Sequence, residues 1–217
     1  MCEGPLIEND KNHSFSHSGV GAIMGSKKVK AIAVKGDNEI PVLDPDKLKE
    51  YSKKWTEGAS AEGLFPIVGK AGVPNSNYEG VLNLVGLSAK NWTQNSLEGF
   101  GKGMSEHEIT PRPCYRCPVA CCYDAKVKTG PRKGFVASLS GGGENQEGAS
   151  SIVGVSNPAD VWYLTDLNDR LGFETSTVGC AMAVAFEAYE KGLLAKDDTD
   201  GLELEWGDVE TIEKLLR

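Results

Sequence analysis

The sequence predicts an α+β fold in which a short β segment lies within the first 40 residues and a mostly helical body follows. The alternation of Val29, Ile32 and Val34, closed by Gly36, indicates a strand near the end of the first part. Three later stretches each place a capping residue ahead of an apolar or amphipathic segment, which is typical of helices. The strand comes early and the helices come late, so the two kinds of element are separated along the chain.

The first helix is predicted in the segment LDPDKLKEYSKKWTEG. Asp44 is placed as the N-cap, and Pro45 stands at the first helical position. Gly58 stands where the helix is expected to stop, and the charged residues before it indicate a surface helix. Residues 59–110 hold many Gly, Asn and Ser residues between short apolar runs, so we expect short helices and loops there.

A second helix is predicted to begin with Asn157 as N-cap and Pro158 at the first position. Its apolar face comprises Val161, Leu164, Leu167 and Leu171. The nearly all-apolar stretch TSTVGCAMAVAFEAYEKGLL predicts a third helix, central in a bundle and ending at Gly192. Residues 138–151, which precede these helices, are predicted to form a flexible glycine-rich loop with two carboxylates.

The last helix is predicted to begin at Asp208. Its apolar face comprises Val209, Ile212, Leu215 and Leu216. The sequence stops at Arg217 with neither a glycine nor a proline terminator, in the middle of this face. We therefore expect the 217 residues to be a fragment rather than a finished domain.

The chain has a formal net charge of -8 at pH 7. This acidic balance argues against a nucleic-acid or anionic-membrane surface, because either would need a clustered basic patch. No apolar run approaches the roughly 18 residues of a membrane span, and the first residues have neither the basic nor the apolar region of a secretion signal. We therefore expect no nucleic-acid partner, no membrane partner and a cytoplasmic location.

Four of the six cysteines fall within nine residues, and this density indicates a metal or cluster site rather than a disulfide framework. Cys114, Cys117 and Cys121 read C-x2-C-x3-C, and three thiolates on a tight loop can converge on one iron–sulfur cubane. A structural zinc site, which would want a second cysteine pair, and a redox or structural role are the alternatives. The adjacent Cys122 should point elsewhere as a buried spectator, and Cys180 lies in an apolar helical stretch where buried cysteines are common.

A glycine-rich stretch precedes the predicted strand. It matches neither a Walker A loop, from which its spacing differs, nor a dinucleotide fingerprint, which follows a strand. Its candidate ligand-binding residues are Gly19, Gly21, Gly25, Ser26 and Lys27. The glycines could let backbone amides approach an anionic ligand, and the alternative is a tight turn that packs against the strand.

Four segments occur in this order along the chain: GVGAIMGSKKVKAIAVKG, CYRCPVAC, NDRLGFETSTVG and DGLELEWGD. In this combination the sequence resembles the tungsten-dependent aldehyde:ferredoxin oxidoreductase family over nearly its whole length. The resemblance implies that residues 1–40 are the C-terminal part of a β domain that grips the cofactor. It also implies that residues 41–217 belong to a helical domain with the iron–sulfur loop, and that the chain is truncated at both ends relative to the family.

The resemblance assigns cofactor roles to the cysteines and to a second motif. In the family, C-x2-C-x3-C supplies three ligands of a 4Fe–4S cluster, and the fourth is a cysteine beyond the end of this chain. The family's pterin-binding signature D-x-x-G-L-D stands here as Asp169, Gly172 and Glu174, with Phe173 in place of leucine. The glycine-rich stretch matches a part of the β domain near the bis-pterin cofactor, although His17 replaces an arginine of the family pattern.

Two glutamates of the glycine-rich loop are candidates for an acid/base group. The family often has G-P-E-Y-E beside the metal, and the segment GENQE leaves the register open between Glu144, which we favour, and Glu147. The alternative is that both are solvated loop charges. His107, seven residues before the first cysteine of the motif, could tune a cluster, relay protons or be an ordinary surface histidine.

The resemblance implies the oxidation of an aldehyde to a carboxylic acid at a tungsten (or molybdenum) bis-pterin centre. Electrons would then pass through the 4Fe–4S cluster to ferredoxin or another electron-transfer subunit. The alternatives are a tungsten subunit of a class II benzoyl-CoA reductase-like complex and a non-catalytic iron–sulfur electron-transfer fragment. We expect a small-molecule substrate, either a homo-oligomer or a complex subunit, and little activity from the 217 residues alone.

Overall fold

The structure, a computed structural model, describes residues 4–9, 13–61, 87–115, 117, 121–139 and 148–217. These residues contain five α-helices and two small antiparallel sheets, which confirms the predicted α+β class. In chain order the elements are β1 (Ile7–Asn9), β2 (His13–Phe15), α1 (Val20–Ser26), α2 (Pro45–Ala61), β3 (Glu108–Pro111), β4 (Tyr123–Lys126), β5 (Val136–Leu139), α6 (Pro158–Leu171), α7 (Thr175–Glu190) and α8 (Val209–Leu216). Three short 3-10 helices lie at Met104–Glu106, Ser151–Val153 and Lys196–Thr199.

The N-terminal part is a β-hairpin followed by the short helix α1. β1 pairs with β2 antiparallel, so that Glu8 lies opposite Ser14. The chain then takes a left-handed conformation at Gly19, with φ of 66°, and enters α1. Most of the glycine-rich stretch is therefore helical rather than a turn.

The strand predicted from Val29, Ile32 and Val34 does not form. Residues 29–36 are neither helix nor strand, and the side chains of Ile32 and Val34 are 78% and 89% exposed. A single strand leaves its backbone N–H and C=O groups unpaired, and none of the residues placed in the structure offers this segment a partner strand. The apolar alternation is present, but the pairing that would turn it into a strand is not.

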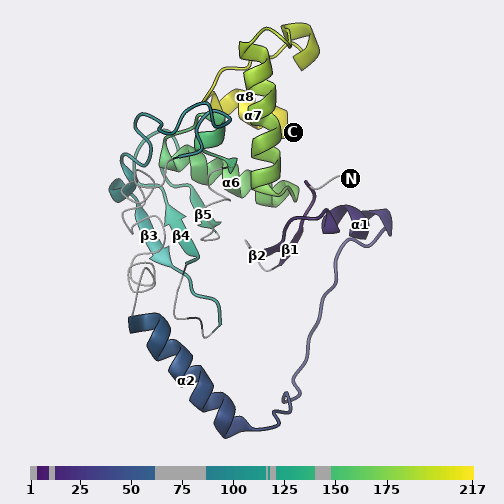
Figure 1. The fold of residues 1–217 in the computed structure, drawn as a ribbon, viewed down its shortest axis with the longest axis vertical. Helices are drawn as coiled ribbons and strands as arrows, with labels where there is room; N and C mark the ends of the chain where they lie inside the picture. The colour runs from purple at the N-terminus through teal and green to yellow at the C-terminus, as the bar shows by residue number, and fades with distance from the viewer. Residues whose placement is uncertain (1–3, 10–12, 62–86, 116, 118–120, 140–147) are drawn as a thin grey trace.

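α2 begins where the sequence predicts. The side-chain Oδ1 of Asp44 accepts a hydrogen bond from the Lys47 N–H at 3.0 Å, which caps the first turn. The helix continues through Gly58, where it was expected to have stopped, and ends at Ala61. Figure 1 shows α2 standing apart from the sheets and the other helices, and its Tyr51 side chain is 58% exposed, as expected of a surface helix.

The cysteine motif lies beside a three-stranded antiparallel sheet of order β3-β4-β5. This sheet was not predicted from the sequence. The segment that connects β3 to β4 carries the cysteines. One face of the sheet packs against α6 through the buried side chain of Trp162. The buried residues of this small core are Tyr123, Ala125, Val127, Ala137, Leu139, Ala159 and Trp162.

The two capped helices near the C-terminus form as predicted. The Asn157 side chain accepts hydrogen bonds from two N–H groups of the first turn of α6, and Asp208 caps α8 in the same way through the Glu210 N–H. α7 ends just before Gly192, which has a φ of 69° and so provides the left-handed residue that stops a helix. No helix in the described ranges is both long enough and apolar enough to cross a membrane.

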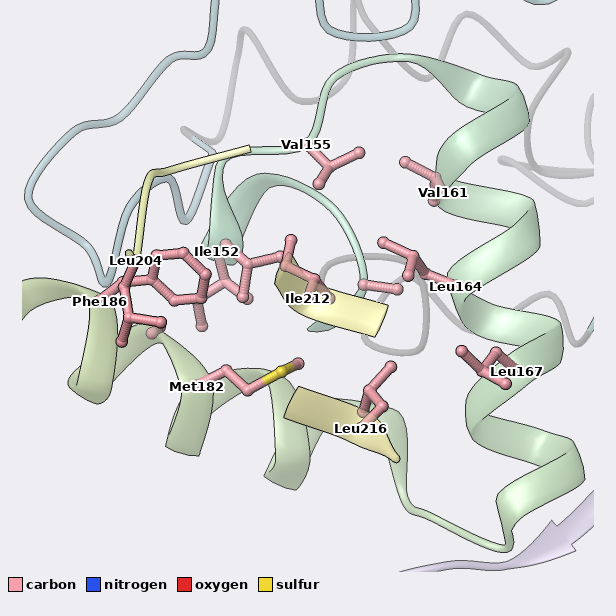
Figure 2. Packing of buried hydrophobic residues seen from close by; sticks show 13 residues of the cluster. Ile152, Val155, Val161, Leu164, Leu167, Met182, Phe186, Leu204, Ile212 and Leu216 are labelled. Carbon is pink, nitrogen blue, oxygen red and sulfur yellow. The ribbon is translucent and has the colours of Figure 1, made fainter. Parts of the chain in front are cut away.

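The main hydrophobic core lies among α6, α7, α8 and the turn at Ser151–Val153. Its buried residues are Ala149, Ile152, Val153, Val155, Val161, Leu164, Leu167, Met182, Ala183, Phe186, Leu204, Ile212 and Leu216. Figure 2 shows side chains from these elements pointing toward one another. Two expectations need correction: Leu171 is 39% exposed at the end of α6, and α7 leaves Val184 58% exposed, so α7 is not surrounded by the described residues.

Candidate functional site

A cavity of about 670 Å³ lies between the β1–β2 hairpin, α1 and the C-terminal end of α6. Small-molecule sites usually have volumes of about 300–1,000 Å³, so this cavity has the size of a ligand site. Its walls include Glu8, Phe15, Gly21, Gly25, Leu171 and Gly172. The fold thus brings part of the glycine-rich stretch beside Leu171 and Gly172, in the middle of the Asp169–Glu174 segment, although the two are far apart in the sequence.

Residues 4–6, which we call the N-terminal strap, hold this cavity together through backbone hydrogen bonds. The Leu6 N–H donates to the carbonyl oxygen of Gly172 at 3.0 Å. The Glu174 N–H donates to the carbonyl oxygen of Gly4 at 2.7 Å. The strap therefore fixes the segment after α6 against the start of the chain.

Gly21 packs α1 onto the same strap. Its N–H donates to the carbonyl oxygen of Pro5 at 3.2 Å. A Cβ at this position would lie 2.4 Å from the carbonyl oxygen of Leu6, which is closer than real Cβ atoms come, so glycine is required by the close approach of two backbones. At Gly25, one turn later, a Cβ would have nothing within 4 Å.

The two polar candidates at the end of α1 are not part of the cavity wall. The Ser26 hydroxyl donates to the carbonyl oxygen of Ile23 at 2.8 Å, within the helix itself. Lys27 is exposed, and its backbone N–H completes the last turn of α1. Only Gly21 and Gly25 of the predicted glycine-stretch residues line the cavity, while Gly19 starts the helix.

Asp169 lies in the last turn of α6, close to the cavity. Burial, and after it the negative charges of Glu8 and Asp166, raise the pKa of Asp169 to about 7. Its carboxyl group therefore gains or loses a proton near neutral pH, beside a cavity that Glu8 lines. A carboxyl of this kind can serve as donor or acceptor to a bound ligand.

Glu174 is buried and caps the first turn of α7. Its carboxylate accepts hydrogen bonds from the Ser176 N–H at 3.1 Å, from the Thr177 N–H at 2.6 Å and from the Thr177 hydroxyl at 2.5 Å. Burial acts to raise the pKa of Glu174, but these hydrogen bonds outweigh it and hold the pKa below its usual value. The carboxylate is thus ionised and engaged by the helix it starts.

The three cysteines of the C-x2-C-x3-C motif lie on the connection from β3 to β4. The Arg112 N–H donates to the carbonyl oxygen of Cys122 at 2.7 Å, which closes the base of the loop. The Cys117 N–H donates to the carbonyl oxygen of Cys114 at 3.0 Å, which forms a tight turn between the first two cysteines. Cys114 is exposed, while Cys117 and Cys121 are partly buried, so these thiols are available to a ligand.

Two further residues meet the first cysteine of this loop. The Nε2 atom of His13, on β2, lies 3.2 Å from Sγ of Cys114. These two atoms and Sγ of Cys122 all lie within 4.8 Å of one another. Cys122 is buried as expected, but its sulfur is close to that of Cys114, so the expectation that it points elsewhere is wrong in this respect.

Comparison with known proteins identifies the family of this chain. Residues 46–217 match the model of a family described as aldehyde ferredoxin oxidoreductase, domains 2 and 3. The chain belongs to the aldehyde ferredoxin oxidoreductase family. This confirms the resemblance that the four sequence segments indicated.

Several members of the aldehyde ferredoxin oxidoreductase family are similar to this chain. Tungsten-containing aldehyde ferredoxin oxidoreductases of Thermococcus kodakarensis and Pyrococcus furiosus are 31% and 30% identical to it, each over 95% of this chain and 34% of the relative. The WOR-like subunit of an aliphatic sulfonate oxidoreductase of Pyrococcus furiosus is 28% identical over 94% of this chain and 33% of that protein. The chain therefore spans about a third of the length of these relatives.

The candidate acid/base glutamates of the aldehyde ferredoxin oxidoreductase pattern, Glu144 and Glu147, lie outside the described residues. The next residue, Gly148, is buried against α7. A Cβ on Gly179 would lie 2.1 Å from the carbonyl oxygen of Gly148, and a Cβ on Gly148 would lie 2.3 Å from that of Thr175. The end of the glutamate loop is thus fixed directly against the helix that Glu174 caps.

The two remaining candidates, His107 and Cys180, pack against residues of the hydrophobic cores. The His107 ring packs edge-on against Trp162 with centroids 5.3 Å apart, and its Nδ1 accepts a hydrogen bond from the Lys128 N–H at 3.4 Å. Cys180 is partly buried against the main core, as its apolar stretch indicated.

Sequence reasoning missed His13 and the N-terminal strap. His13 belongs to no motif, and it meets Cys114 across a sequence separation of 101 residues. The strap acts through backbone groups, which carry no signal in the side-chain sequence.

Proposed function

We propose that this chain is part of a tungsten enzyme that oxidises an aldehyde to a carboxylic acid and transfers the electrons to ferredoxin. The observation that carries this proposal is the cavity closed by the N-terminal strap, because it unites two segments that the family resemblance assigns to the pterin. The names of the Thermococcus kodakarensis and Pyrococcus furiosus relatives support the substrate class, the metal and the electron acceptor.

The residues around the cavity fit a pterin that holds the metal. Gly21 and Gly172 keep parts of the wall free of side chains, and Gly21 has no room for one. Asp169 would hold or release a proton at the ligand, because its pKa is about 7. The role of Glu174 at the pterin stays a prediction, since its carboxylate is engaged by the first turn of α7.

The cysteine loop supplies a donor set that fits a 4Fe–4S cluster. Cys114, Cys117 and Cys121 stand on one connection whose turn is fixed by backbone hydrogen bonds, and thiolates are the usual ligands of such clusters. The competing assignment is a single ion held by Cys114, Cys122 and His13, whose ligand atoms are close enough together. Metal analysis separates the two.

The reaction converts an aldehyde and water into a carboxylic acid, two protons and two electrons. When bound, the tungsten pterin supplies two-electron redox chemistry, and the cluster supplies one-electron transfer to ferredoxin. Glu144, or Glu147 in the second register, would accept a proton from the water that adds to the substrate carbonyl. The packing of Gly148 on α7 fixes the residue that follows the two glutamates.

The chain would divide into the same two domains that the family resemblance implies. Residues 1–40 would be the end of the β domain that holds the cofactor, and residues 41–217 would be the helical domain with the cluster loop. The family match over residues 46–217 supports the second part.

A second candidate is a tungsten subunit of a larger redox complex, acting on another substrate. The similarity to the WOR-like subunit of an aliphatic sulfonate oxidoreductase favours it. In that case the cavity and the cluster loop would keep their roles, but the electron partner would be another subunit. A class II benzoyl-CoA reductase-like complex is a variant of this candidate.

Metal analysis of the anaerobically purified whole enzyme, of which this chain is proposed to be a part, tests both candidates at once. We expect four iron and four sulfide ions per enzyme chain together with tungsten, and reduction of a viologen dye when an aldehyde is supplied. Cluster and tungsten without aldehyde activity would favour the complex subunit. Zinc alone, at one ion per chain, would contradict the proposed function.

A further inference from the structure

His13 contacts the first cysteine of the predicted cluster loop. Its Nε2 atom lies 3.2 Å from Sγ of Cys114, a distance at which an N–H donates a hydrogen bond to sulfur. His13 is half-buried on β2, and Cys114 lies on the β3–β4 connection, so this contact joins two parts of the fold that are remote in the sequence. Nothing in the cysteine motif itself requires a histidine there.

The direction of this hydrogen bond follows from what Cys114 does in a cluster. A cysteine that binds iron is a thiolate and has no proton to donate. The ring N–H of His13 must then be the donor, and a neutral imidazole with its proton on Nε2 is sufficient. The interaction therefore requires no change in the charge of the histidine.

A hydrogen bond to a ligating sulfur changes the reduction potential of the cluster. The donor withdraws electron density from the thiolate, which stabilises the reduced cluster with its additional electron. His13 would therefore raise the potential at which the cluster accepts an electron.

The same hairpin forms part of the cofactor cavity. Asn9 is the β1 partner of His13 in the strand register, and both Asn9 and Phe15 line the cavity wall. The hairpin thus carries both His13, which contacts the cysteine loop, and residues of the cavity wall. The hairpin can hold the cluster and the cofactor at a constant separation, which efficient electron transfer requires.

We propose that His13 is a positioning residue that donates an Nε2–H hydrogen bond to the cluster thiolate of Cys114 and raises the reduction potential of the cluster. This inference rests on the proposed function, because it requires a cluster on the cysteine loop. It differs from a role as metal ligand, in which His13 and Cys122 would bind an ion directly together with Cys114.

The test is a redox titration of the cluster, followed by electron paramagnetic resonance, in the anaerobically purified holoenzyme and three variants. His13→Ala removes the donor. His13→Gln keeps an amide N–H at about the reach of the imidazole Nε2, and it therefore provides the conservative rescue. Ser14→Ala, on the neighbouring strand position, is the matched control for a change in the hairpin, because Ser14 faces the other side of the strand.

We expect His13→Ala to shift the midpoint potential to a more negative value while four iron ions per chain remain bound. His13→Gln should recover most of the shift, and Ser14→Ala should leave the potential unchanged. An unchanged potential in His13→Ala, or a shift of equal size in Ser14→Ala, would contradict the inference. Loss of iron from His13→Ala would also overturn it, because His13 would then be a ligand.

The wild-type protein separates this inference from the proposed function. If its spectrum shows no iron–sulfur cluster, the proposed function fails at that step and the role of His13 fails with it. If the cluster is present and the variants behave alike, only the role of His13 is wrong.

Discussion

A single methyl group at position 21 decides whether α1 can rest on the N-terminal strap. The backbones of Gly21 and Leu6 approach so closely that a Cβ at position 21 would be 2.4 Å from the Leu6 carbonyl oxygen. That oxygen belongs to the backbone and cannot rotate away as a flexible side chain would. The cavity wall therefore depends on glycine at this position for steric reasons, whatever the ligand contributes.

We predict that Gly21→Ala lowers the free energy of unfolding by about 1–3 kcal/mol, because overpacking forces α1 away from the strap. Urea denaturation of the purified protein measures this change, and the tungsten content should fall with it. Gly25→Ala is the matched control in the same helix, since a Cβ there meets nothing within 4 Å. It should be neutral or stabilising by up to about 1 kcal/mol, and equal losses in both variants would show that the contact with the strap is unimportant.

A second prediction at the residue scale concerns Asp169, because its pKa is raised to about 7. The folded state holds this proton more tightly than the unfolded state, whose carboxyl has its ordinary pKa of 3.8. The contribution of Asp169 to stability is therefore fully present below pH 3.8 and is lost as the pH rises through about 7.

The variant Asp169→Asn is neutral at every pH and should remove this loss. We expect its free energy of unfolding to exceed that of the wild type at pH 8, by on the order of 2 kcal/mol once partial solvent screening is allowed for. The difference should shrink as the pH falls toward 4. A difference that stays constant from pH 4 to pH 8 would show that the proton on Asp169 is not its cause.

At the scale of elements, the start of α7 makes several close structural contacts. Glu174 caps the helix, Thr175 contacts the backbone of Gly148, and Gly179 has no room for a side chain beside Gly148. Gly148, at the end of the glutamate loop, and Glu174, at the end of the Asp169–Glu174 segment, thus both lie at the start of α7. A change in the cap should affect both.

We predict that Glu174→Ala lowers the free energy of unfolding by about 1–2 kcal/mol, since it removes the acceptor for the first-turn N–H groups of α7. Glu174→Asp can still cap the turn, as aspartate commonly does, and should lose less. Asp44→Ala, at the cap of the exposed helix α2, is the matched control and should cost less than Glu174→Ala in chemical denaturation. A larger loss at Asp44 would show that the burial of the α7 cap does not matter.

Four of the five described helices, α2, α6, α7 and α8, were predictable from the sequence because their signals are local. Asn157 and Asp208 cap α6 and α8 as expected, and the residues that follow them supply the buried faces. The strands were not predictable in the same way, because a strand depends on a partner. Val29, Ile32 and Val34 alternate but pair with none of the described residues, whereas the short strands of the three-stranded sheet pair and were overlooked.

The same difference between local signals and contacts with distant segments applies to the candidate site. Cys114, Cys117 and Cys121 could be found from their spacing, and the segment ending at Gly172 could be found from the family pattern. His13 could not, because it meets Cys114 only in the folded chain, across a sequence separation of 101 residues. Motifs identify side chains that share one segment, and contacts between distant segments need the fold.

At the scale of the whole molecule, the cysteine loop and the cavity are two separate parts that the hairpin connects. We predict that Cys117→Ser reduces the iron content several-fold, because a serine oxygen is a poor substitute for a thiolate at iron. Cys180→Ser, in α7 against the main core, is the matched control and should keep its iron. Iron analysis and the visible absorption spectrum measure both, and equal iron loss in the two variants would point to general unfolding instead.

The N-terminal strap has a consequence for the order of folding. Leu6 precedes its backbone partner Gly172 by most of the described chain. Closing so long a loop carries an entropic cost, and contacts of high sequence separation form slowly. The wall of the cavity can therefore be completed only after Gly172 has been synthesised and has reached the strap, so a ligand held by this wall would bind late in folding.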